Sequence, residues 1–225
     1  RILSTPVPYQ PVALEYLPNA NSLIPTAACP GNNVLTYSTT LGTTAAPYQI
    51  YIASGINLGS GQTVVINGPT VIVVYGNVTM SGTATIQLRT VGSVAASLAI
   101  FAENGTVNIN CTGAGGIVNL NTVPVPKNFA LLSTSNTSTT DTVALTQAMP
   151  FYGVVYFPFL KVTVGSTGAS AFICGSIVGS SVTFTNSPII HYDRALRTPD
   201  STIGDVAFTY LTPPSTVSNF VASVP

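Results

Sequence analysis

The sequence predicts an all-β protein, a single-stranded parallel β-helix in which one chain coils repeatedly and each coil pairs with the next. The phrase of alternating apolar and small polar residues at 55–66 returns at 77–88. A related phrase that begins at Gly153 returns at Gly175, with the same separation between the two copies. Strands and turns that repeat about every 20 residues are typical of a β-solenoid. We expect its coil to be right-handed.

Residues 1–48 predict an extended, proline-rich arm. Prolines this dense exclude a helix and a central strand. The arm is also apolar, so it needs a surface to lie on, in its own subunit or in a neighbour. The prolines are Pro6, Pro8, Pro11, Pro18, Pro25 and Pro30. The side chains expected to make the assembly contact are Val7, Tyr9, Val12, Leu14, Tyr16 and Leu17.

Residues 49–196 predict the β-helix body. Residues 71–75 are expected to add a third strand between the repeated phrases, and residues 98–101 and 107–111 to continue the stack. The rhythm breaks at 112–150, where we predict a surface excursion. A short loop helix at 140–149 is the strongest helical candidate in the chain.

Residues 197–225 predict a C-terminal cap and tail. Charged residues gather just after the last repeat, at Asp193, Arg194, Arg197, Asp200 and Asp205. A solenoid end exposes unpaired backbone groups and needs a polar or irregular cover. We therefore expect His191, Tyr192 and Asp193 to end the last coil, and residues 205–212 to add one strand over an edge.

The composition indicates an extracellular or cell-surface protein. Charged residues make up 5% of the 225 residues and the formal net charge is zero. Such a polar but uncharged surface suits proteins that pack against their own copies, whereas cytosolic proteins usually carry net charge. The lack of a basic patch argues against nucleic acid. No apolar run is long enough to predict a membrane-spanning helix.

Cys29, Cys111 and Cys174 allow one disulfide and one buried thiol, or three buried thiols. The first arrangement would join the N-terminal arm to the body. Four Asn-x-Ser/Thr sequons occur, of which Asn77, Asn104 and Asn136 are the glycosylation candidates. Neither cysteine nor histidine spacing predicts a metal site, and we expect no cofactor.

The acidic residues argue against an enzyme. Polysaccharide lyases and hydrolases with this fold need clustered carboxylates along the flank of the solenoid. Here only Asp193, Asp200 and Asp205 lie close together, beyond the last repeat. His191 with Asp193 suggests a triad only weakly, because no Gly-x-Ser-x-Gly elbow is present. An aromatic group for stacking sugars is the remaining binding feature, formed by Tyr152, Tyr156, Phe157 and Phe159.

The paired phrases GVVYFP–KVTV and GSIVGSSVTFTNSPIIHYDRAL resemble the C-terminal β-helix domain of bacterial pilus-assembly and tight-adherence surface proteins. The resemblance covers residues 50–196. It departs at Phe157, where that family favours alanine, and across 112–150. It implies a cell-surface or appendage role without known catalysis. The matching residues are Gly153, Tyr156, Pro158, Val162, Gly175, Ile177, Val178, Val182, His191, Tyr192, Asp193 and Leu196.

These observations favour a non-enzymatic structural subunit of an extracellular filament, pilus or surface layer. Its partners would be its own copies or other appendage subunits, joined when the arm of one subunit adds a strand to the next. The alternative is an appendage-associated adhesin or carbohydrate-binding module with a glycan partner. A polysaccharide lyase or hydrolase is a third hypothesis.

Overall fold

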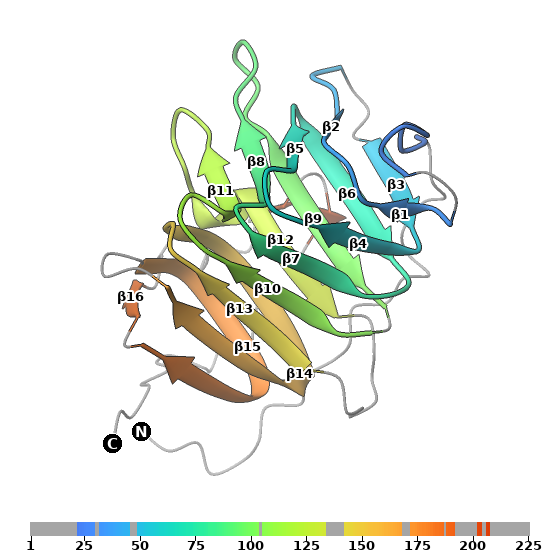
Figure 1. Cartoon of the computed structure of the whole chain (residues 1–225). Coiled ribbons are helices and arrows are strands. Elements are labelled where there is room, and N and C mark those ends of the chain that lie inside the picture. The colour runs from blue at the N-terminus through green and yellow to red at the C-terminus, as the bar shows by residue number, and fades with distance from the viewer. Residues whose placement is uncertain are drawn as a thin grey trace.

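The computed structural model describes residues 22–29, 32–45, 49–103, 105–133, 142–167, 172–186, 188–191, 202–203 and 206–207. Its strands stack as a parallel β-helix, which confirms the predicted fold (Figure 1). The proposed arm residues Val7, Tyr9, Val12, Leu14, Tyr16 and Leu17 lie outside the described residues, as do Tyr192 and Asp193.

The first four coils each have three sides, visited in the same order along the chain. Side 1 is formed by β1 (Val34–Leu35), β4 (Gly55–Leu58), β7 (Val78–Gly82), β10 (Val107–Cys111) and β13 (Thr142–Gln147). Side 2 is formed by β2 (Thr39–Leu41), β5 (Thr63–Ile66), β8 (Thr85–Arg89) and β11 (Gly116–Leu120). Side 3 is formed by β3 (Gln49–Ala53), β6 (Pro69–Val74), β9 (Ser97–Ala102) and β12 (Phe129–Ser133).

The later coils have two sides only. β14 (Phe151–Ser166) begins on side 3 beside β12 and ends on side 1 beside β13. β15 (Phe172–Thr185) follows the same path, and a register shift between Phe157 and Lys161 marks the corner. β16 (Ile189–His191) then pairs with the first part of β15. The 3-10 helix η2 (Pro126–Asn128) precedes β12, and β17 (Thr202–Ile203) with β18 (Val206–Ala207) forms a separate antiparallel hairpin.

The repeats read from the sequence are neighbours in the structure. Thr63 pairs with Thr85 and Ile56 with Val78, so both pairs join equivalent positions of the repeated phrase. Gly153 pairs with Gly175 in the same way. Gly175 has φ +149°, and a Cβ there would lie 1.8 Å from the Gly153 carbonyl oxygen, so only glycine fits.

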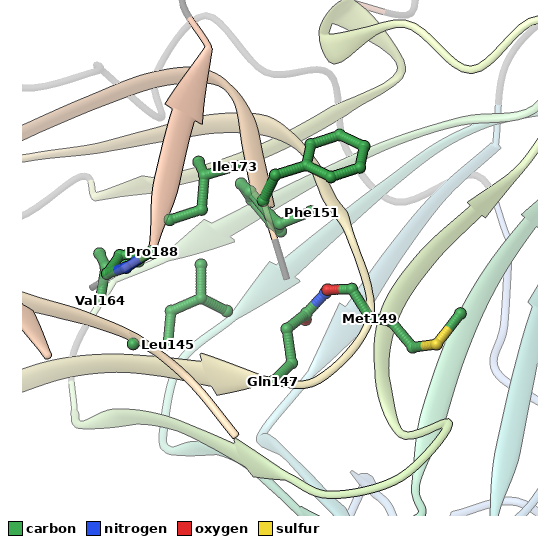
Figure 2. A pocket seen from close by; sticks show the side chains of 9 residues that line it. Leu145, Gln147, Met149, Phe151, Val164, Ile173 and Pro188 are labelled. Carbon is green, nitrogen blue, oxygen red and sulfur yellow. The ribbon is translucent and has the colours of Figure 1, made fainter. Parts of the chain in front are cut away.

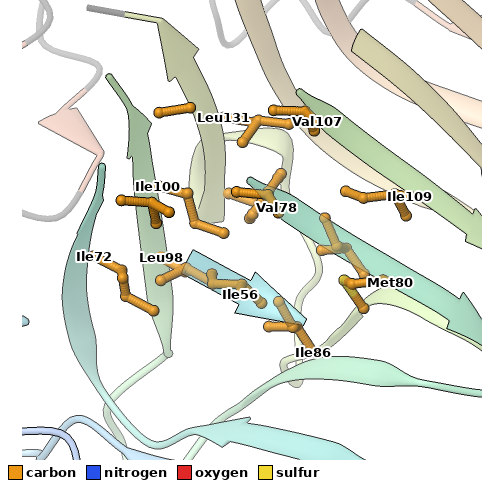
Figure 3. Packing of buried hydrophobic residues seen from close by; sticks show 14 of the residues in the cluster. Ile56, Ile72, Val78, Met80, Ile86, Leu98, Ile100, Val107, Ile109 and Leu131 are labelled. Carbon is orange, nitrogen blue, oxygen red and sulfur yellow. The ribbon is translucent and has the colours of Figure 1, made fainter. Parts of the chain in front are cut away.

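The core fills the inside of the coils. Inward residues alternate with outward ones along each strand, so adjacent coils place their apolar side chains in rows (Figure 3). Ile56, Ile72, Leu98 and Ile100 are completely buried in these rows. Burying one such side chain contributes about 2 kcal/mol, and the rows therefore supply the main stabilising term.

Three expectations about the layout are wrong. Strand pairing starts at β1, before residue 49, because the proline-free stretch 32–45 already joins the stack. The described parts of 112–150, residues 112–133 and 142–150, do not form an excursion, since β11, β12 and β13 all pair with strands of earlier coils. The helix proposed at 140–149 is strand β13, whose valine, leucine and glutamine alternate inward.

Candidate functional site

The two ends of the β-helix differ. Ile24, Ala28 and Cys29 belong to the buried core, and the Ala28 carbonyl accepts hydrogen bonds from the Thr36 and Tyr37 amides at 2.9 and 3.2 Å. The Ser22 amide also donates to the Ile50 carbonyl at 3.1 Å, at the free edge of β3. Residues 22–29 therefore close the N-terminal end, at the point where residues 1–21 join the body.

The C-terminal end, which we call the open end, exposes its apolar side chains. Phe184 lies opposite the buried Val164, and Ile190 lies opposite the buried Ile173, so both continue inward rows of the core. They are nevertheless 41% and 45% exposed, and Ile189 is 58% exposed. Among the described residues, no strand pairs with the outer edge of β16 or of the second half of β15. Unpaired edges with apolar side chains are templates for a further strand.

Side 3 carries a second apolar surface on its outer face, which we call the outer stripe. It crosses β3, β6, β9, β12 and β14 and is buried throughout. Outward positions on side 1 are instead polar, such as the exposed Asn57, Asn108 and Asn110. The residues of the outer stripe are Ile50, Val71, Val73, Ala99, Phe101, Ala130, Leu132, Val154 and Tyr156.

Three rings continue the outer stripe toward the open end. Phe172 packs edge to face against Tyr152 at 5.5 Å between ring centroids, and against His191 at 5.9 Å. These rings are partly or fully exposed. The sugar-stacking group predicted from sequence is not assembled, because Phe157 points into the core and Tyr156 is buried in the outer stripe. Tyr152 is the one predicted member that joins this ring cluster.

Gln147, the last residue of β13, covers the edge of β11, where side 2 ends and no further strand of that side follows among the described residues. Its side-chain oxygen accepts from the Ile117 amide at 3.0 Å, and its side-chain nitrogen donates to the Ile117 carbonyl at 3.1 Å. The amide group thus makes the two bonds that a next strand would make to β11. Sequence reasoning missed this residue, since only the register of β11 reveals its partner.

A small cavity lies near Gln147, where side 2 ends. It measures about 10 Å³ and is lined by Gln147 and mainly by apolar side chains, including Leu145, Phe151 and Ile173 (Figure 2). A cavity of this size holds one water molecule at most. It offers no room for a substrate or a cofactor.

The chemistry-bearing residues remain apart. Glu103 is the one carboxylate among the described residues, and one of its oxygens is buried without a hydrogen-bond partner. The described residues also contain no group of three or more histidine, cysteine and acidic side chains able to hold a metal ion. Within the same part of the chain, no helix is long and apolar enough to cross a membrane. Asp193, Asp200 and Asp205 lie outside the described residues.

None of the three cysteines forms a disulfide. Cys29 packs on the first coil and Cys111 ends β10 on the fourth, about 14 Å away at about 4.8 Å per coil, which exceeds the span of a disulfide. Cys174 lies two coils further, on side 3. Burial raises the pKa of Cys29, and it raises the pKa of Cys111 to about 11. Both therefore stay protonated near neutral pH, so the alternative of buried thiols fits them best.

The remaining predicted residues are placed only in part. Asn77 is exposed in the turn before β7, and its side-chain oxygen accepts from the Thr106 amide of the next coil at 2.9 Å. Asn104 and Asn136 lie outside the described residues. His191 does end the last described strand of the stack, where its ring contacts Phe172.

The stacked coils, with their filled interior and one open end, define the chain as a parallel β-helix. The chain belongs to the DUF7305 family, a domain of unknown function, whose profile matches residues 27–199. This range begins in the segment 22–29 that closes the N-terminal end. It includes β16 and stops before β17. No curated protein and no solved structure matches the chain.

Proposed function

We propose that this protein is a non-enzymatic structural subunit of an extracellular filament, pilus or surface layer. The observation that carries the proposal is the difference between its ends. The N-terminal end is closed by residues 22–29, whereas the open end exposes Phe184, Ile189 and Ile190 beside unpaired strand edges. A body with one closed and one receptive end favours head-to-tail stacking, and a contact that does not close on itself gives a fibre.

The N-terminal arm supplies the strand that joins two subunits. Residues 1–21 attach at the closed end, which in a head-to-tail stack faces the open end of the next subunit. Fully extended, an arm of this length spans about 70 Å, several times what is needed to cross the junction. In this proposal, the alternating apolar side chains around Val12, Leu14 and Tyr16 pair with the edges of β15 and β16 by strand addition.

The test is assembly of a chain that lacks residues 1–21. The cut stops there because Ile24, Ala28 and Cys29 are part of the core. We expect the full chain to form filaments in negative-stain micrographs, and the truncated chain to stay monomeric in sedimentation velocity while keeping its circular dichroism. Normal filaments from the truncated chain would contradict the role of the arm.

A pair of point variants tests the receiving end. Ile190→Asp places a charge in the exposed apolar row of the open end and should stop elongation. Asn57→Asp adds the same charge on the outer face of side 1, where Asn57 is already exposed, and should leave assembly unchanged. Equal loss in both variants would show that net charge, rather than the open end, controls assembly.

The alternative function is an appendage-associated adhesin or carbohydrate-binding module, which the ring cluster of Tyr152, Phe172 and His191 favours. Exposed rings can stack against sugar faces. A glycan array should then give hits that Phe172→Ala removes, with Tyr75→Ala, another exposed ring, as the control. A polysaccharide lyase or hydrolase is the third hypothesis. Its test is the joint substitution of Asp193, Asp200 and Asp205 by Asn. Catalytic turnover that survives this substitution would exclude the three aspartates as the catalytic residues.

A further inference from the structure

Cys174 is the accessible thiol of the chain. Cys29 and Cys111 are buried in the core, with 6% and 0% of their surface exposed, and burial raises the pKa of both thiols. Cys174 is partly exposed on β15 and forms no disulfide. Its neighbour Ile173 is buried in the core, so alternation along the strand turns the Cys174 side chain to the outer face of side 3. One thiol sulfur therefore lies at the surface near the open end.

His191 lies beside this thiol. The two residues pair in the ladder between β15 and β16, and Ile190, just before His191, pairs with the inward Ile173. His191 therefore faces outward with Cys174, and it is exposed. Paired residues on adjacent strands lie about 4.8 Å apart, with the side chains on one face roughly parallel. Sequence spacing does not reveal this pair, because only the register of the two strands brings its members together.

Phe172 restricts the imidazole of His191. Phe172 precedes Cys174 by two positions and therefore lies on the same outer face of β15. Its ring contacts the His191 ring edge to face, with 5.9 Å between the centroids. The contact keeps the imidazole over β15, the strand that carries the thiol. A ring already restricted in this way loses less conformational freedom when its nitrogen binds a ligand.

The two side chains suit a soft cation of low coordination number. A thiolate sulfur and an imidazole nitrogen that bind one ion lie at most about 4.3 Å apart, given metal bonds of about 2.3 and 2.0 Å. This distance is close to the spacing of about 4.8 Å between the strands. The described part of the chain holds no group of three or more histidine, cysteine and acidic side chains. Structural zinc takes four such ligands and is a poor match, whereas thiolate sulfur selects Cu(I), an ion that two ligands can satisfy.

We propose that Cys174 and His191 form a binding site for a soft monovalent cation, with Cu(I) as its biological ligand. The Cys174 sulfur and one ring nitrogen of His191 bind the ion. A sulfur–copper bond replaces the S–H bond of the thiol, the proton passes to solvent, and the copper remains monovalent. The two side chains project from the flank of side 3, so the site goes beyond the structural role proposed above and does not depend on it.

A copper titration tests the site. Cu(I) is added without oxygen to the reduced full chain, in competition with the chelator bicinchoninate, whose copper complex absorbs visible light. We expect one bound Cu(I) per chain. Cys174→Ser and His191→Ala should each weaken binding more than about 100-fold, because losing only an outer-sphere partner of a metal ligand costs about 10- to 100-fold. Unchanged affinity in either variant would overturn the proposal.

Two further variants separate this pair from the other thiols and from the ring contact. Cys111→Ala removes a buried thiol and leaves the pair intact, so it should bind Cu(I) as the unmodified chain does. Phe172→Ala keeps both ligands and frees the imidazole, so it should weaken binding only about 10-fold. Two or three bound ions per chain that persist in Cys174→Ser would show that the core thiols bind copper, and would contradict the assignment.

The unmodified chain provides a second measurement, which holds even if a variant fails to fold. His191 is the single histidine of the sequence, so its imidazole protons give one identifiable set of NMR signals. These signals should shift when one equivalent of Cu(I) is added. Iodoacetamide should alkylate Cys174 alone in the folded chain, as located by mass spectrometry, and Cu(I) should protect it. Unshifted imidazole signals, or alkylation at the same rate with and without Cu(I), would refute the site.

Discussion

The three-sided coils, from β1 to β12, and the two-sided coils that follow enclose the hydrophobic core in different ways. In the first region the strands are short and each strand ends at a corner, so the core is enclosed on three sides. In the second region β14 and β15 run through a corner without a break, at 16 and 14 residues. Burial then declines from β14 to β15 and is lost at β16. The comparison shows that losing one side thins the core and leaves the apolar side chains of the last described coil exposed.

A glycine on the side 3 half of β15 should separate the two regions most strongly. Gly175→Ala places a Cβ 1.8 Å from the Gly153 carbonyl oxygen in the two-sided region. We expect it to lower the free energy of unfolding by at least about 4 kcal/mol. Gly61→Ala is the matched control in the three-sided region, where φ is +81° but no atom lies within 4 Å, and it should cost about 1–2 kcal/mol. Urea unfolding measures both, and equal losses would contradict the steric argument.

Core truncation should show how much thinner the second region is. Ile100 on β9 is completely buried, and Ile100→Ala should lower the free energy of unfolding by about 3–4 kcal/mol. Ile177 on β15 is partly buried against the same core, and Ile177→Ala should cost about 1 kcal/mol. The measurement is again urea unfolding. A loss at Ile177 as large as at Ile100 would mean that the last coil is better enclosed than its exposure indicates.

Gln147 tests the boundary between the regions. Gln147→Ala leaves the amide and carbonyl of Ile117 without partners at the edge of β11, which should cost about 2–3 kcal/mol. Hydrogen exchange at the Ile117 amide should accelerate at the same time. The matched change Gln87→Ala removes a half-buried glutamine from the middle of side 2 and should cost under about 1 kcal/mol. Unchanged exchange at Ile117 would refute the strand-like role of the side chain.

The smallest expected effect is an alkaline one at Cys111. Its folded pKa of about 11 lies above the ordinary value of 9.0, so the folded state keeps the thiol proton that the unfolded state loses. The stabilisation from this thiol is therefore complete below pH 9 and is lost as pH rises toward 11. Subtracting the stability–pH curve of Cys111→Ala from that of the unmodified chain should give this slope. Thr112→Ala, a neighbouring exposed position, should give none.

The sequence predicts the stack wherever the spacing between coils is regular. The pairs Ile56 with Val78 and Gly153 with Gly175 follow directly from the constant separation of the repeated phrases. Val107 pairs with Val143 across a much longer interval, because β11, η2 and β12 lie between them and their connections are long. Variable spacing of this kind hides a repeat, which is why residues 112–150 read as an excursion and β13 as a helix.

The candidate surfaces are only partly visible in the sequence. Apolar runs without alternation, such as Val71 to Val74 and Leu98 to Phe101, are a signal for the outer stripe, since both faces of those strands are buried. The open end has no such signal. Phe184 and Ile190 look like ordinary core residues, and only the absence of a pairing strand among the described residues distinguishes them.

The regular step between β5 and β8 makes the length of this rod an adjustable quantity. Thr63 pairs with Thr85, and residues 63–84 contain one strand of each side. Deleting that block joins Gln62 to Thr85, and each residue of the next coil then makes the backbone hydrogen bonds that the deleted residue made. Duplicating the block adds one coil to the stack. Each whole block therefore changes the length of the stack by about 4.8 Å, and neither residues 22–29 nor the open end is altered in sequence.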